Sequence, residues 1–227
     1  MSIIKITDLH KVYDETNVHV HALNGVDLTI NEGEFTAIVG PSGSGKTTLL
    51  NMIGGLDVPS RGEVNINGTS ISKLKSRKLI DFRLHNIGFV FQAYNLIPVL
   101  TALENVAFIM QLQGQPKDKR HKRAMELLNS VGIADKADQR PGNLSGGQQQ
   151  RVAVARALAS EPKFILADEP TANLDSKSTS ELLDMMQKMN RELNITFLFS
   201  THDNRVVEKA RRIITIEDGK VASDVTI

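Results

Sequence analysis

Short apolar segments separated by turn residues fill the first third of the chain. In three segments, apolar and β-branched residues alternate with polar ones or follow one another directly, a pattern typical of strands. These predicted strands span residues 3–6, 26–30 and 35–39. Three dipeptides that end in glycine predict turns between or beyond the strands. They are Asn24-Gly25, Glu32-Gly33 and Asn67-Gly68.

The middle of the chain, from about residue 94 to 159, changes to a helical pattern. Apolar residues recur every three or four positions over 103–112 and 122–131, which predicts two amphipathic helices. A third helix is expected through 151–158, because Asn143 and Ser145 before it are residues that commonly begin helices.

The last third alternates between strands and helices. It is expected to form strand 164–167, helix 178–193, strand 196–200 and a hairpin of 213–216 and 220–222 that turns at Asp218-Gly219. Strands that alternate with helices imply parallel βαβ units. We therefore predict one α/β domain over 1–227. Its core, 1–93 and 160–227, has a parallel-rich sheet and an antiparallel β flank, and it carries an inserted α-helical subdomain at about 94–159.

Composition narrows the chemistry available to this domain. The 227 residues include no cysteine, which excludes disulfides, thiolate catalysis and cysteine-ligated zinc. A net charge of +1, no tryptophan and only two tyrosines argue against a nucleic-acid partner. The densest basic run, KDKRHKR at 117–123, is expected to be the solvated start of a helix. No apolar stretch approaches the roughly 18 residues that span a bilayer, so we expect any membrane role to come through a partner.

A glycine-rich loop, GPSGSGKTT at 40–48, stands between predicted strand 35–39 and a predicted helix at 46–53. This order is the context in which G-x-x-x-x-G-K-[ST] binds the phosphates of a nucleoside triphosphate, and it assigns the α/β fold to the P-loop NTPase class. Lys46 is expected to reach the β- and γ-phosphates, and the Thr47 hydroxyl to ligate Mg²⁺. The predicted ATP-binding residues are Gly40, Ser42, Gly43, Ser44, Gly45, Lys46, Thr47 and Thr48.

Two acidic residues follow the apolar run 164–167. Such a run is a buried strand that delivers carboxylates to the edge of the sheet where α/β proteins bind ligands. Asp168 is expected to hold Mg²⁺ through water, and Glu169 to face the attacking water. Two acids at a strand end are, by themselves, more often a helix cap or a solvated turn, but the phosphate loop favours the catalytic role.

The segment LSGGQQQR at 144–151 is a second candidate phosphate site. Ser145, Gly146 and Gly147 begin the predicted third helix, whose dipole and free N–H groups attract anions. Because one γ-phosphate rarely needs two such sites in one chain, we expect this one to serve the nucleotide of a second copy. The alternative is an ordinary capped helix with two glycines in its first turn.

These motifs, in this order, resemble those of ABC transporter nucleotide-binding domains over essentially the whole chain. GPSGSGKT is similar to the Walker A motif, LSGGQQQR to the ABC signature and FILADEP at 164–170 to Walker B. The resemblance implies an ATPase that requires Mg²⁺ and works as a homodimer around two ATP molecules. In that dimer each ATP lies between the Walker A loop of one copy and the signature of the other.

Four more residues acquire roles through this resemblance. Gln92 is similar to the Q-loop glutamine, which senses Mg²⁺ and the γ-phosphate, and Asp175 to the acid of the D-loop beside the nucleotide. His202 is similar to the switch histidine that contacts the γ-phosphate and supports Glu169, and Tyr13 to an aromatic residue that stacks on adenine. The implied catalytic residues are Glu169, His202, Lys46 and Gln92, and the implied metal ligands are Thr47, Gln92 and Asp168.

Longer segments narrow the resemblance to one group. VHALNGVDLTI at 20–30, YNLIPVLTALENV at 94–106 and LADEPTANLD at 166–175 are similar to ATPases of lipoprotein release, macrolide export and cell division. Members often have Gly where this chain has Ala172 and Ser where it has Thr47, and neither difference puts activity in doubt. The resemblance implies an integral membrane permease with an extracytoplasmic domain as partner, and thus a cytoplasmic subunit peripheral on the inner membrane.

Three functions fit this motor. The first is a transporter subunit that moves a substrate across or out of the membrane; export of a lipoprotein, lipid, peptide or drug is expected, and import stays open. The second is an ATPase that works a membrane protein mechanically, as in cell division. The third is a soluble ABC ATPase of DNA maintenance or translation. The balanced charge disfavours the third, and so does the short separation of Lys46 from Ser145, which leaves no room for coiled-coil arms. The sequence does not separate the first two. Apolar residues at 96–100 are either a docking surface for the partner or core of the helical subdomain.

Overall fold

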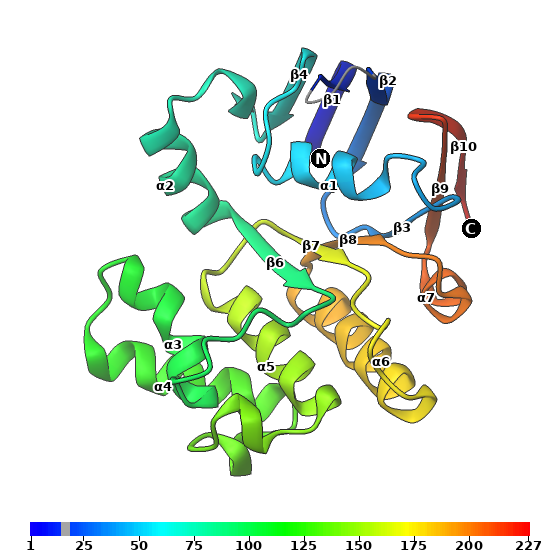
Figure 1. Ribbon diagram of the computed structural model, residues 1–227. Helices are drawn as coiled ribbons and strands as arrows, with labels where there is room; N and C mark the ends of the chain where they lie inside the picture. The colour runs from blue at the N-terminus through cyan, green and yellow to red at the C-terminus, as the bar shows by residue number, and fades with distance from the viewer. Residues whose placement is uncertain (15–18) are drawn as a thin grey trace.

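The computed structural model describes residues 1–14 and 19–227, which form two β-sheets and a layer of helices (Figure 1). The first sheet is antiparallel, with strand order β2-β1-β4-β5. Its strands are β1 (Ser2–Tyr13), β2 (Val20–Asn31), β4 (Arg61–Ile66) and β5 (Thr69–Ser70). This sheet is the predicted antiparallel flank.

Strands β1 and β2 are longer than the sequence pattern predicts, and one predicted turn is wrong. Leu9 pairs with Val26 whereas the next residue, His10, pairs with Asn24. Gly25, with φ of +79°, is therefore the extra residue of a β-bulge inside β2. A glycine with positive φ suits a bulge as well as a turn, so the dipeptide alone does not distinguish the two. The turns at Glu32-Gly33 and Asn67-Gly68 are confirmed.

The second sheet has the order β10-β9-β3-β8-β7-β6. In the described part of the chain, the five strands from β9 to β6 form four parallel pairs, and β10 alone is antiparallel, paired with β9 as the predicted hairpin. The strands are β3 (Phe35–Val39), β6 (Ile87–Phe91), β7 (Phe164–Asp168), β8 (Thr196–Ser200), β9 (Arg212–Glu217) and β10 (Lys220–Thr226). The parallel-rich α/β sheet is thus confirmed.

Seven α-helices connect the strands of the described residues. They are α1 (Lys46–Ile53), α2 (Ser76–Asn86), α3 (Ala102–Leu112), α4 (Lys117–Ser130), α5 (Gly146–Ala159), α6 (Ser176–Leu193) and α7 (Asn204–Lys209). Helix α4 begins five residues earlier than its apolar pattern predicts, and the basic run 117–123 forms its first turns. Helix α2 is not predicted, because none of its residues is buried and it therefore has no apolar stripe to show in the sequence. Among the described residues, no helix has the length and apolar character needed to cross a bilayer.

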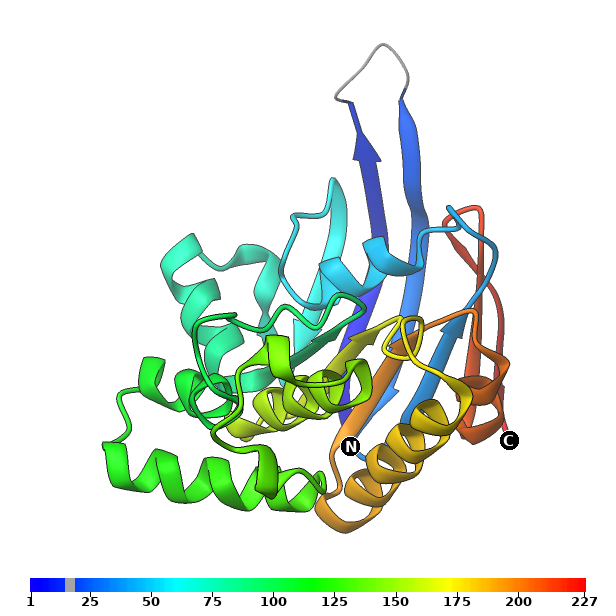
Figure 2. The ribbon, with the colours of Figure 1, turned by 60° about the horizontal axis from the view of Figure 1, so that its bottom comes forward.

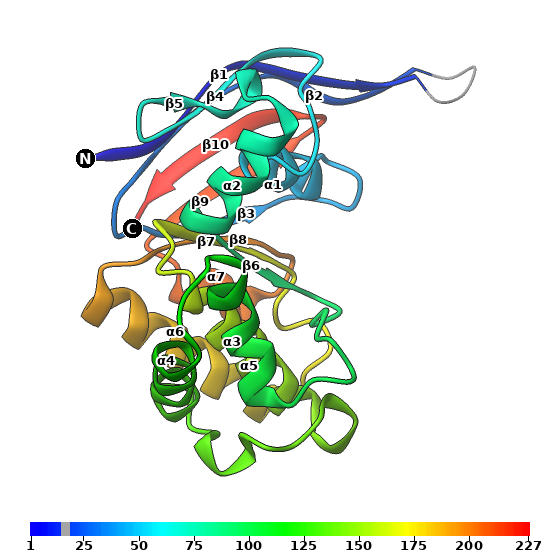
Figure 3. The ribbon, with the colours of Figure 1, turned by 90° about the vertical axis from the view of Figure 1, so that its left-hand side faces the viewer.

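The parallel sheet is buried on both faces. Phe164 and Leu166 of β7 pack into one apolar cluster with α1 and the antiparallel sheet, whereas Ile165 and Ala167 pack into another with helices α3 to α6. This alternation follows from the two-residue repeat of a strand. Figures 2 and 3 show the resulting layers, with α1 between the two sheets and α3 to α6 below the parallel sheet. The carboxyl edge of the parallel sheet stays open for the loops that follow its strands.

Candidate nucleotide-binding site

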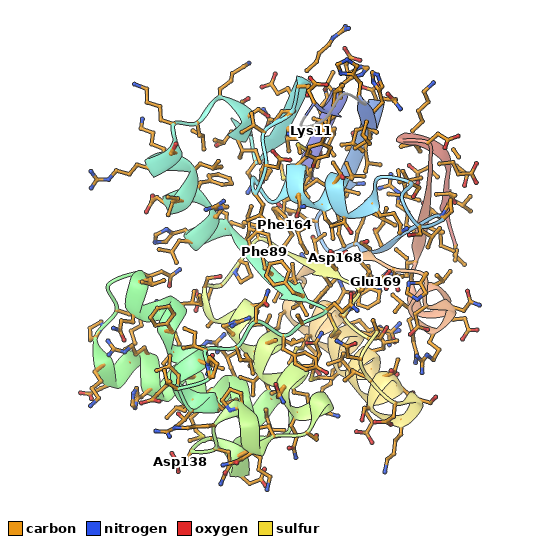
Figure 4. The ribbon with its side chains drawn as sticks, viewed as in Figure 1. Lys11, Phe89, Asp138, Phe164, Asp168 and Glu169 are labelled. Atoms are coloured by element: carbon orange, nitrogen blue, oxygen red, sulfur yellow. The ribbon has the colours of Figure 1, made fainter. Side chains whose placement is uncertain are left out.

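Four parallel strands deliver the predicted site residues to one edge of the sheet. The glycine loop follows β3, Gln92 follows β6, Glu169 follows β7 and His202 lies just beyond β8. Asp168 is the last residue of β7 and pairs in register with Ser200 of β8. Figure 4 shows Asp168 and Glu169 at this carboxyl end of β7. Ligands of open α/β sheets bind at such an edge.

The glycine loop needs glycine at both ends. Gly40 has φ of +146° and Gly45 has φ of +104°. A Cβ atom on Gly40 would lie 2.0 Å from the carbonyl oxygen of Ile216, and one on Gly45 would lie 2.4 Å from that of Ala22. Helix α1 begins at Lys46, inside the loop, and no side chain of a described residue caps its N-terminus. The loop therefore presents the free N–H groups of a helix start, which favour a phosphate.

The last two residues of the G-x-x-x-x-G-K-[ST] motif, Lys46 and Thr47, face the interior of the loop and the end of β7, respectively. The Lys46 ammonium donates to the carbonyl oxygens of Gly40 and Pro41, each at 2.8 Å. The Thr47 hydroxyl donates to Asp168 Oδ1 at 3.2 Å. A hydroxyl and a carboxylate this close are hard oxygen donors, which suit Mg²⁺ when it also binds phosphates.

Glu169 is held in place by residues at the end of β8. Its backbone has φ of +46°, and its N–H donates to the Ser200 carbonyl at 2.9 Å. One carboxylate oxygen accepts from the Thr201 hydroxyl at 3.3 Å, and the other is hydrogen-bonded to His202 Nδ1 at 2.8 Å. The Glu169 side chain is 17% exposed and that of His202 is 75% exposed. A nearly buried carboxylate with two partners is thus positioned beside an accessible imidazole.

A cavity of about 440 Å³ joins these groups. Most of the glycine loop lines it, together with Tyr13, Glu169, His202 and the segment 20–22 of β2, and its volume is in the range of small-molecule sites. Sequence reasoning missed Val20, His21 and Ala22. The pairing of β1 with β2, in which Val20 lies opposite Tyr13, brings these residues to the site. The sequence alone does not reveal that pairing.

Tyr13 is fixed at the cavity wall. Its hydroxyl donates to Asp57 Oδ2 at 2.9 Å, and the Lys11 ammonium lies 4.7 Å from the centre of its ring. Burial would raise the pKa of Asp57, but hydrogen bonds from Lys11, Val58 and Tyr13 outweigh it and the pKa is lowered. The ionised Asp57 therefore anchors the ring.

Four sets of predicted site residues are not among those that line this cavity. Gln92 is exposed, and its carbonyl oxygen accepts from Asn173 Nδ2 at 2.9 Å. Asp175 caps α6 and accepts from the Ser178 N–H at 2.9 Å; hydrogen bonds from the Ser178 hydroxyl and N–H lower its pKa. The segment 145–147 begins α5. Asp168 touches the site through Thr47.

Helix α5 begins as the sequence predicts. Ser145 is its N-cap and accepts from the N–H of Gln148, whose side chain in turn accepts from the Ser145 N–H at 2.9 Å. Gly146 and Gly147 are its first two residues. A capping box of this kind orders the helix start.

A further network, unforeseen from the sequence, ties the segment after Gln92 to α5. Tyr94 and Asn95 have φ of +57° and +49°. The guanidinium of Arg156 donates to both of their carbonyl oxygens, at 2.8 Å for Tyr94, and burial lowers its pKa. The Tyr94 hydroxyl donates to the Asn173 carbonyl at 3.4 Å. Nothing local in the sequence marks this pair as left-handed or Arg156 as their partner.

Comparison with known proteins agrees with this geometry. The ABC transporter family model matches residues 23–172. The chain is 47% identical to the lipoprotein-releasing system ATP-binding protein LolD 1 of Rhodopseudomonas palustris, over 97% of this chain and 98% of that protein. It is 44% identical to the macrolide export ATP-binding/permease protein MacB of Brucella melitensis, over 99% of this chain and 34% of that one.

A solved structure is similar throughout. It is the dimeric, post-hydrolysis state of the ATP-binding cassette MJ0796 bound to ADP and Pi, from Methanocaldococcus jannaschii, with a TM-score of 0.91 and 44% identity over 99% of this chain and 98% of that one. The chain belongs to the ABC transporter family, and it is an ATP-hydrolysing cassette of that family. The predicted fold class and the predicted ATPase activity are therefore confirmed.

Proposed function

We propose that two copies of this chain enclose two ATP molecules head to tail and drive a separate membrane permease, most directly for export. The observation that carries this proposal is the composition of the cavity. It contains Lys46, Glu169 and His202, whereas the start of α5 lies outside it. A second copy would complete each site with its own Ser145, Gly146 and Gly147, as the dimeric state of MJ0796 suggests.

The nucleotide would be held by the groups that line the cavity. The loop N–H groups and Lys46 would bind the phosphates, and the Tyr13 ring would stack on adenine. Thr47 and Asp168 would hold Mg²⁺, with Gln92 beside it; the two oxygen atoms 3.2 Å apart fit that ion. When bound, Mg²⁺ supplies positive charge that offsets the charge of the phosphates.

Hydrolysis would need a base for the attacking water. Glu169 would accept its proton, because its carboxylate reaches the cavity and is oriented by Thr201 and His202. Lys46 and the N–H groups of both helix starts would offset the charge that develops on the γ-phosphate. Loss of that phosphate would remove contacts made only in the closed dimer, and the dimer would reopen.

The permease would dock in an apolar groove of about 560 Å³ between α2, β6, α3 and α5. Phe89 and Phe91 of β6 and Phe108 of α3 line it. Of the residues 96–100, Leu96 packs into the core, Ile97 lines the groove and Val99 is 71% exposed. Leu96 is thus part of the core, as one alternative expects, and we propose that Ile97 and Val99 belong to the docking surface.

The names of the relatives support the proposed transport role. LolD 1 and MacB are named for lipoprotein release and macrolide export, so we propose that this chain drives export of a lipoprotein, lipid, peptide or drug. It would lie on the cytoplasmic face of the inner membrane, held by a permease with an extracytoplasmic domain. The division into a core of 1–93 and 160–227 and a helical subdomain at about 94–159 stays part of the proposal.

Glu169→Gln tests the catalytic assignment. The variant keeps the shape of the side chain but cannot accept a proton, so ATP turnover should fall by at least about 100-fold. ATP binding should persist, and size-exclusion chromatography with ATP should show a dimer that the wild type forms only transiently. Glu32→Gln, the same substitution at an exposed glutamate in the turn before β3 and outside the cavity, is the control and should keep most of the turnover. Wild-type turnover in Glu169→Gln would contradict the assignment.

A further inference from the structure

Basic side chains are concentrated in two segments on either side of the apolar groove. The segments 73–83 and 117–123 carry ten of the 27 Lys and Arg residues of the chain but two of its 26 Asp and Glu residues. The rest of the chain is therefore net acidic, although the whole has a charge of +1. A balanced total thus hides a strongly uneven distribution.

Six of these cations project into solvent, and we call them the basic flanks. They are Lys75, Arg77 and Lys78 at the start of α2, and Lys117, Lys119 and Lys122 at the start of α4. All six are exposed. The nearby ion pairs within the described part of the chain, Lys73–Glu63 at 3.3 Å and Arg123–Glu126 at 3.4 Å, use other basic residues. None of the six cations of the basic flanks forms an ion pair with a described residue.

The two flanks share one side of the molecule. Figure 1 places α2 and the turn between α3 and α4 at the same edge, and Figure 3 shows that edge face-on. The groove opens between them. Its rim includes Ile80 of α2, 57% exposed, and Leu112 of α3, 55% exposed. Exposed apolar side chains beside lysines are typical of a surface that lies at a membrane interface.

We propose that the basic flanks bind the headgroups of anionic phospholipids beside the permease. This rests on the proposed docking in the groove, which would hold this edge toward the membrane. Five of the six cations are lysines, and they are spread over two helices instead of converging on one pocket. Lysine is a flexible point charge, whereas a defined carboxylate on a protein partner favours the planar fork of arginine. The arrangement therefore fits a diffuse anionic surface.

Co-sedimentation of the full chain with lipid vesicles tests the proposal. Binding should occur with phosphatidylcholine vesicles that contain roughly 40% phosphatidylglycerol, and not with pure phosphatidylcholine, because each lysine near an anionic surface strengthens binding about fivefold. About 0.5 M salt should abolish it by screening. Absence of binding to the anionic vesicles at low salt would overturn the proposal.

Charge-neutral variants locate the contact. The triple variant Lys75→Gln, Arg77→Gln, Lys78→Gln and the triple variant Lys117→Gln, Lys119→Gln, Lys122→Gln should each bind at least about tenfold more weakly. A matched control, Lys5→Gln, Lys188→Gln, Lys220→Gln, changes the net charge equally at exposed positions elsewhere and should stay within about twofold of wild type.

Two outcomes would overturn the assignment to the flanks. One is a control variant that loses as much binding as the flank variants. The other is a short DNA duplex that binds the wild type more tightly than the vesicles do, which would assign the flanks to nucleic acid. Circular dichroism melts check folding, and all six side chains are exposed, so the melts should not change. The vesicles contain no permease, so failure here leaves the groove and the Glu169 assignment standing.

Discussion

Glu169 reaches the cavity because its backbone turns into the left-handed region directly after β7. That conformation is costly for a residue with a side chain. It is held by the hydrogen bond that the Glu169 N–H donates to the Ser200 carbonyl, and by those of its carboxylate with Thr201 and His202. Local strain that several contacts maintain is common where a side chain must be aimed. The same reasoning applies to Tyr94, whose left-handed backbone is held by Arg156.

A steric contact links Tyr94 to the start of α5 and gives a residue-scale prediction. A Cβ atom on Gly146 would lie 2.8 Å from the Tyr94 hydroxyl. Gly146→Ala should therefore lower ATPase activity about three- to tenfold, because displacing the tyrosine disturbs the helix start that the proposed dimer places against the ATP of the second copy. In a Tyr94→Phe background the methyl group has room, and the same substitution should cost less than about twofold.

Steady-state ATPase assays on the wild type, Gly146→Ala, Tyr94→Phe and the double variant measure how strongly the effect of Gly146→Ala depends on the Tyr94 hydroxyl. Gly142→Ala is the control, because a Cβ atom there meets nothing within 4 Å. Equal losses from Gly146→Ala in both backgrounds would show that the tyrosine hydroxyl is not what the methyl group meets.

The ends of β7 and β8 are joined by a small polar network around Asp203. Asp203 caps α7, accepts from the Thr171 hydroxyl at 2.8 Å and pairs with Arg205. Its N–H donates to the Thr201 hydroxyl at 3.0 Å, which itself bonds Glu169. Hydrogen bonds from Arg205, then Thr171, lower the pKa of Asp203 to about 2. The network therefore fixes the position of Thr201, which in turn orients the Glu169 carboxylate.

Asp203→Asn tests this network through pH. The depressed pKa means that the charge stabilises the fold above the usual value of 3.8, and that this contribution disappears as pH falls through about 2. Asparagine still caps a helix, so the variant isolates the charge. It should lower the free energy of unfolding by about 1 kcal/mol at pH 7, after allowance for solvent screening. Urea titrations should show the difference shrinking toward pH 3, and a constant difference would contradict the account.

How much the sequence reveals differs from element to element. The glycine loop, β7 and α5 are predicted because each carries a pattern whose chemistry depends on adjacent residues. The bulge at Gly25 and the lining of the cavity by Val20 and His21 depend on how β1 and β2 pair, which is a long-range property. Helix α2 escapes prediction because it buries no residue.

At the scale of the whole molecule, one segment lies between the groove and the site. Phe91 lines the groove and pairs in register with Asp168, and the next residue, Gln92, bonds through its carbonyl to Asn173. A permease in the groove would thus contact Phe91 at the end of β6, beside Asp168, which would hold Mg²⁺. The groove and the ATP site are joined by packed elements, which is what coupling between them requires.

The central claim is that each ATP site is built from two copies, and mixing two inactive variants tests it most directly. Lys46→Ala removes the phosphate contact of one copy, and Ser145→Arg blocks the start of α5 in the other. Each variant alone should be nearly inactive. In a mixed dimer one of the two sites combines the intact loop with the intact helix start, so an equimolar mixture should recover up to about a quarter of wild-type ATPase activity. A mixture that stays as inactive as its components would contradict the split site.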